Sequence, residues 1–114
     1  MLRLLFIAAL VGLPAAASAE KRVYSGAEAQ AIQCAAYYSQ TTRVLERRGL
    51  VTARDREMAE MAATHILLRH VTGGYDQRVK AVGAALRSLP QEDMAFVAES
   101  ARYLDWCRLT FLSE

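Results

Sequence analysis

The sequence predicts a small all-α protein, an antiparallel four-helix bundle that is closed by one disulfide and preceded by a signal peptide. Three observations lead to this fold class. After the first 19 residues the chain is rich in alanine, its apolar residues recur at helical spacing, and no run alternates between apolar and polar as a strand would. Capping and turn residues divide this region into four segments of helical length. The only two cysteines lie near its opposite ends.

The N-terminus has the three parts of a secretory signal peptide. Arg3 carries a positive charge, a run of ten residues follows that is apolar but for one glycine, and small residues stand at Ala17 and Ala19, which signal peptidase reads. The apolar run is about half of the roughly 20 residues that a helix needs to cross a membrane, so we expect cleavage and no stable membrane anchor. Residues 1–19 are therefore predicted to be removed. One domain at residues 20–114 is then expected in the periplasm or outside the cell.

Caps and breaks define four helices, with predicted spans of 25–48, 52–72, 75–89 and 90–112. The first two begin with capping-box patterns, Ser25 with Glu28 and Thr52 with Asp55, in which each side chain accepts a hydrogen bond from the partner's backbone N–H. Glycines follow both helices, where a left-handed residue can end a helix. Pro90 ends the third helix and is expected in the first turn of the fourth.

The apolar stripes predict which face of each helix is buried. On the first helix the stripe passes through Tyr38 and leaves Tyr37 beside it. On the fourth helix the stripe runs through Leu104 and Phe111 and leaves Trp106 outside. Because the connections are short, we expect an antiparallel up-down-up-down order in which the first and fourth helices are neighbours.

The two cysteines are compatible with that topology. In an antiparallel pair, Cys34 and Cys107 would lie roughly 14 and 8 Å from the same end of the bundle, about one helical turn apart. Export to an oxidising compartment favours pairing of cysteines placed in this way. We therefore expect a Cys34–Cys107 disulfide.

Charge and motifs argue against several classes of function. The chain has 14 Lys and Arg against 12 Asp and Glu, and loss of Arg3 with the signal leaves a mature charge of about +1. Nucleic-acid binding needs a concentrated positive field, so none is expected. The sequence lacks a nucleophile elbow, a Cys-x-x-Cys redox pair, a His-Glu-x-x-His helix and a covalent haem motif. We predict neither an enzyme nor a bound cofactor.

The strongest metal candidate is the set Met58, Met61 and His65. These residues fall within about 60° of arc on one predicted helix, and thioether with imidazole suits copper(I). Met94 on the fourth helix is a further possible ligand. The alternative is that the methionines fill the core and the histidine packs at its edge. An enzymatic site built from Glu57, Glu60 and His65 is a third hypothesis, which no motif supports.

Aromatic residues outside the core stripes suggest a second kind of site. Trp106 lies beside Tyr103, and such residues often anchor a protein partner, although a guanidinium lid from Arg102 is an equal alternative for the indole. Tyr37 either flanks a groove or packs at the core boundary. The leading hypothesis is a non-enzymatic accessory, adaptor or inhibitor that binds another exported protein through Trp106, Tyr103 and Tyr37. A small-ligand or copper-binding bundle is the alternative, and the oligomeric state is left open.

Overall fold

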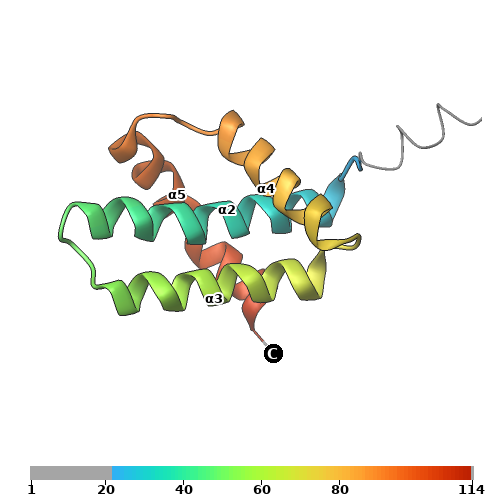
Figure 1. Ribbon diagram of the computed structural model, residues 1–114, viewed down its shortest axis with the longest axis horizontal. Helices are drawn as coiled ribbons and strands as arrows, with labels where there is room; N and C mark the ends of the chain where they lie inside the picture. Colours follow the sequence, from blue (N-terminus) through green and yellow to red (C-terminus); the bar gives the residue numbers. More distant parts are fainter. Residues whose placement is uncertain (1–21, 114) are drawn as a thin grey trace, which may run out of the picture.

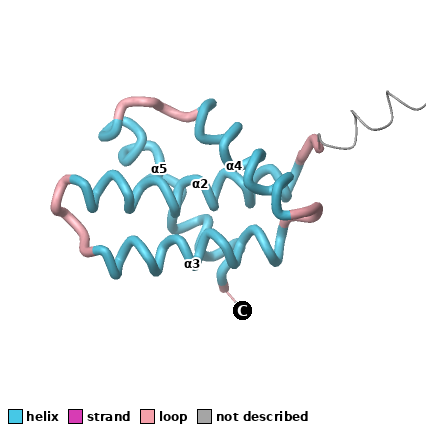
Figure 2. Tube along the Cα trace, in the orientation of Figure 1, coloured by secondary structure: helices cyan, strands magenta, loops and turns pink. Residues whose placement is uncertain are grey.

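The computed structural model describes residues 22–113, and in this part of the chain the fold is all-helical without a strand (Figures 1 and 2). The predicted signal peptide at residues 1–19 lies outside the described residues. The elements are α2 (Gly26–Arg47), α3 (Ala53–His70), α4 (Tyr75–Ser88), α5 (Asp93–Cys107) and a short π-helix, η1 (Arg108–Leu112), that continues α5. The predicted all-α fold class is thus confirmed.

Helix ends follow local capping in part. The capping box that opens α3 is present, since Thr52 Oγ1 accepts from the Asp55 N–H at 3.1 Å and Asp55 Oδ2 accepts from the Thr52 N–H at 2.9 Å. The box expected at Ser25 and Glu28 is absent, because the Ser25 side chain makes no cap bond. The Glu28 carboxylate instead accepts two hydrogen bonds from the Thr72 N–H and hydroxyl, each 2.7 Å long.

The start of the last helix also differs from the expectation. Pro90 lies in the loop after α4, and α5 begins at Asp93. The cap is Glu92, whose carboxylate accepts from the backbone N–H of Met94 at 3.0 Å and of Ala95 at 2.9 Å. A side-chain cap on two orphan N–H groups therefore sets the start of α5.

The turn between α3 and α4 requires a glycine. Gly73 has φ +103°, a conformation that L side chains rarely adopt. A Cβ at this position would lie 2.6 Å from Gln77 Oε1 and 2.7 Å from the Tyr24 hydroxyl. Gly74, the next residue, has an ordinary φ of −85° and open space around it.

α2 is the central element of the fold. It packs against α3, which runs beside it in the opposite direction, and also against α4 and α5 (Figure 1). The first and last helices are therefore neighbours, as expected, and η1 reaches α3. A regular antiparallel order of all four helices stays a prediction.

The core follows from this central position. α2 buries eight residues, whereas α4, which packs on α2, buries none. Several of the buried α2 residues are alanines, which let neighbouring helices approach closely, and the larger core side chains include Ile66, Phe96 and Phe111. Thr41 Oγ1 donates a 2.7 Å hydrogen bond to Ser100 Oγ, which joins α2 to α5 inside the core.

The predicted disulfide between Cys34 and Cys107 is present. Its Cα atoms are 5.6 Å apart and both residues are buried, so the bond fixes the middle of α2 to the end of α5. None of the helices in the described part of the chain is both long and apolar enough to cross a membrane.

Candidate functional site

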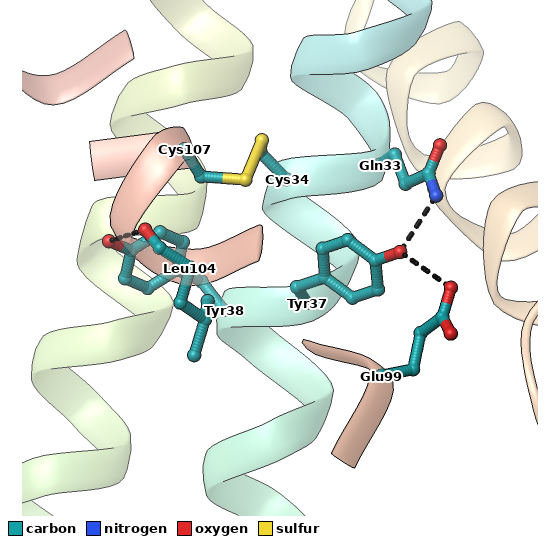
Figure 3. Close-up of a disulfide and its surroundings, with 7 residues drawn as sticks. All are labelled: Gln33, Cys34, Tyr37, Tyr38, Glu99, Leu104 and Cys107. Atoms are coloured by element: carbon teal, nitrogen blue, oxygen red, sulfur yellow. Dashed lines mark hydrogen bonds between the residues drawn. A yellow bond between two sulfur atoms is a disulfide. The ribbon is translucent and has the colours of Figure 1, made fainter. Parts of the chain in front are cut away.

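A groove between α2 and α5 is the candidate binding site. Because a helix turns once in 3.6 residues, positions three, four and seven apart share a face, and this spacing gives one wall from α2 and the other from α5. The Cys34–Cys107 disulfide joins the two walls (Figure 3). The hollow has a volume of about 520 Å³ and is lined by Gln30, Gln33, Cys34, Tyr37, Tyr103, Trp106 and Cys107. We call it the aromatic groove.

Tyr37 forms the rigid part of the groove. Only 2% of its surface is exposed, and its ring stacks on Tyr103 with centroids 5.7 Å apart and planes 3° apart. Its hydroxyl accepts a 2.8 Å hydrogen bond from Gln33 Nε2 and donates a longer one, 3.5 Å, to Glu99 Oε2 (Figure 3). Burial raises the pKa of Tyr37, and the Gln33 hydrogen bond offsets part of that rise. The phenol is therefore neutral at physiological pH and packs as a fixed ring.

Tyr103 and Trp106 supply the exposed aromatic surface, with exposed fractions of 39% and 45%. Of the two alternatives for Trp106, the Arg102 lid is wrong, because the guanidinium carbon lies over the Tyr103 ring instead, 5.7 Å from its centroid. Trp106 meets Phe111 edge to face at 5.8 Å. Within the described residues its indole N–H makes no hydrogen bond.

The groove has no charged side chain among its lining residues. Its polar groups are the two glutamine amides, the tyrosine hydroxyls and the indole N–H. Glu99, which does not line the groove, accepts a hydrogen bond from the Tyr37 hydroxyl. An uncharged lining with a few polar groups is typical of a recognition surface for a neutral ligand or segment.

The structure brings together the three residues proposed for partner binding. Tyr37, however, is buried and stacks against the ring of Tyr103, so it is not itself an exposed anchor. Sequence reasoning missed Gln30 and Gln33, which complete the α2 wall. The expected disulfide contained the signal that finds them, because joining the two cysteines places the neighbouring turns of the first and last helices side by side.

The proposed metal ligands lie elsewhere, on the outer face of α3. Met58 and Met61 are 58% and 70% exposed, and His65 is exposed too, so the interpretation of these methionines as core filler is wrong. Met61 and His65 line a shallow hollow that Met58 does not reach. Met94 does not line this hollow either. No group of three or more His, Cys, Asp or Glu residues in the described chain is placed to hold a metal ion.

The scattered acidic residues of α3 are partly engaged in ion pairs. The Glu60 carboxylate accepts from Arg43 at 2.9 Å and from Arg56 at 3.0 Å, and Arg56 also pairs with Glu46 at 2.6 Å. This network joins α3 to α2. Both oxygens of Glu60 are occupied by guanidinium groups.

Comparison of the chain with protein-family models, curated proteins and solved structures finds no match.

Proposed function

We propose that the protein is a non-enzymatic accessory, adaptor or inhibitor that binds a segment of another exported protein in the aromatic groove. The observation that carries this proposal is the gathering of Tyr37, Tyr103 and Trp106 around one uncharged hollow. Binding hot spots are enriched in Trp and Tyr, and such rings add contact area while losing little conformational entropy.

The groove is held in place before a partner arrives. The disulfide, whose two cysteines line the groove, fixes α2 to α5. The buried Thr41–Ser100 hydrogen bond joins the same two helices at a second point. Stacking on buried Tyr37 restricts Tyr103. A surface ordered in advance loses less entropy on association, which supports a binding role for this groove.

Compartment and domain organisation are parts of the same proposal. A disulfide-bonded domain is compatible with the periplasm or the cell exterior. We propose export through a signal peptide at residues 1–19, followed by a mature bundle at residues 20–114. The partner is then a protein of the same compartment.

Site-specific photocrosslinking in the producing cells tests the function. A photoreactive amino acid replaces Gln30, which lines the groove, and in a matched control it replaces Tyr75, an exposed aromatic on α4 outside the groove. We expect a discrete adduct from position 30 that disappears in the Trp106→Ala background. An absent adduct at position 30, or an adduct that Trp106→Ala leaves unchanged, would contradict binding in the groove.

A copper(I) site on α3 is the second candidate, favoured by the exposure of Met58, Met61 and His65. Thioether and imidazole groups on an open helix face are accessible to a metal, whereas buried ones would only pack. Titration of copper(I) against a competing chelator tests this function, with Met61→Leu and His65→Ala as site variants and Met94→Leu as the control. Affinity that neither site variant lowers would rule the site out.

A further inference from the structure

We propose that the segment bound in the aromatic groove is an uncharged, proline-containing stretch in the polyproline II conformation. This inference rests on the proposed function and adds the chemistry of the partner. Three properties of the groove support it: its free hydrogen-bond donors, its lack of charge and its length.

The donors favour a ligand whose backbone carbonyls are unpaired. In the described chain, neither the Trp106 indole N–H nor the Gln30 amide has a hydrogen-bond partner, although both line the groove. A polyproline II segment has no internal hydrogen bonds, so its carbonyl oxygens are free to accept. A bound helix uses its backbone carbonyls internally, so it could satisfy these donors only through its side chains.

Addition of a strand is excluded by how the walls are made. One wall consists of side chains from α2 and the other of side chains from α5. The backbone N–H and C=O groups inside both helices are already paired. Pairing by β-augmentation needs an exposed sheet edge, which the described residues do not contain. The partner must therefore be read by side chains.

Charge excludes the acidic or phosphorylated segments that arginine clusters recognise. No lining residue is charged, and the nearby Arg102 guanidinium already lies over the Tyr103 ring. Grooves lined by aromatic rings are instead the surfaces in which proline-rich segments dock. Trp106 is 45% exposed, and its indole combines an apolar ring face that a pyrrolidine can pack on with an N–H that can donate to a carbonyl.

The length of the groove fits a short segment of this kind. Gln30 to Tyr37 spans seven steps of a helix, or roughly 10 Å. At about 3.1 Å per residue, three to four residues of polyproline II cover that distance, which is one Pro-x-x-Pro unit. Because such a segment is stiff before it binds, little entropy is lost when it meets a rigid groove.

Fluorescence titration of the purified, oxidised protein tests the inference, because Trp106 is the one tryptophan in the chain. The probe is a blocked nine-residue peptide made of three Pro-Pro-Ala repeats, and the control is a blocked alanine-glycine peptide of equal length. We expect a saturable emission change with the proline peptide alone. Isothermal calorimetry with the same peptide then compares variants: Tyr103→Ala is expected to weaken binding by about tenfold or more, and Tyr75→Ala to leave it unchanged.

Replacing Trp106 by phenylalanine isolates the hydrogen bond. Trp106→Phe keeps an aromatic ring and removes the indole N–H, so we expect weaker binding by calorimetry with an unchanged far-ultraviolet circular dichroism spectrum. Equal affinity for the two peptides, no saturation at millimolar peptide, or equal effects of Tyr103→Ala and Tyr75→Ala would overturn the inference.

The result also separates this inference from the proposed function. If position 30 forms its crosslink while the proline peptide fails to bind, protein binding stands and the polyproline assignment falls. If emission of Trp106 instead depends on protein concentration, and Trp106→Ala abolishes self-association in sedimentation, the occupant is a second copy of this chain and the polyproline assignment is again wrong.

Discussion

The Cys34–Cys107 bond joins two residues that are 73 positions apart in the sequence, and the effect of removing it can be worked out from that separation. In the chain-entropy model, opening a loop of this length restores conformational freedom to the unfolded chain worth about 4 kcal/mol at 25 °C. A domain of this size has a total stability of roughly 5 to 15 kcal/mol. Reduction should therefore remove a large part of the stability and leave the domain close to unfolding.

Urea unfolding, followed by far-ultraviolet circular dichroism with and without a reductant, measures this loss on the unmodified chain. We expect the midpoint to fall sharply on reduction. The slope of the transition should increase, since an unfolded chain without the crosslink exposes more surface. The Cys34→Ala/Cys107→Ala variant is the control, because the reductant should not change its unfolding.

A loss below about 1 kcal/mol on reduction would refute this reasoning, since it would mean that the unfolded chain stays compact without the bond. An unchanged slope would point in the same direction. Such a result would also weaken the claim that the disulfide sets up the aromatic groove in advance.

Three further perturbations test the turn between α3 and α4, the contact of that turn with α2, and the buried hydrogen bond between α2 and α5. Gly73→Ala should destabilise the fold by about 2 kcal/mol because of its positive φ and the crowded Cβ position, whereas Gly74→Ala should change thermal stability by less than about 1 kcal/mol. The hydrogen bonds from Thr72 hold the pKa of Glu28 below the usual 4.5, so its contribution to the stability of the fold is present above that pH and is lost as the pH falls through the lower pKa of the folded state. Glu28→Gln should therefore reduce the fall in melting temperature between pH 6 and pH 3. An identical pH profile for the variant and the unmodified protein would contradict this. In a double-mutant cycle on Thr41→Val and Ser100→Ala, we expect a coupling energy of about 1 kcal/mol, and a value near zero would show that their buried hydrogen bond adds nothing.

The first helix shows how far sequence periodicity reaches. A single stripe through Tyr38 predicted one buried face, but Tyr37 is the more buried of the two tyrosines. Neighbouring residues on a helix point about 100° apart, and both are covered here because α2 is packed by α3, α4 and α5. In Figure 3 the two rings leave α2 on different sides. A periodic pattern locates a helix and one buried face, but it does not indicate how many other helices pack against it.

Capping motifs had a similar limit. Thr52 and Asp55 form their predicted box because the interaction is confined to one turn. Glu28 has the same spacing from Ser25, yet its carboxylate bonds to Thr72, which the chain brings close only after α3 has folded back along α2. The backbone N–H and the hydroxyl of Thr72, in the turn after α3, took the place of the local partner. The sequence pattern contained no sign of that competition.

By itself, the sequence determined the helical class, the approximate extent of each helix and the pairing of the two cysteines, because these depend on local spacing and on the chemistry of a few residues. Tertiary structure alone decided which flank of each helix is covered and which is open. The methionines of α3 are exposed for this reason, since no other element of the described chain covers that face. The aromatic groove is likewise a product of tertiary structure: its walls come from α2 and α5, and only packing across that sequence distance places Gln30 and Gln33 opposite Trp106.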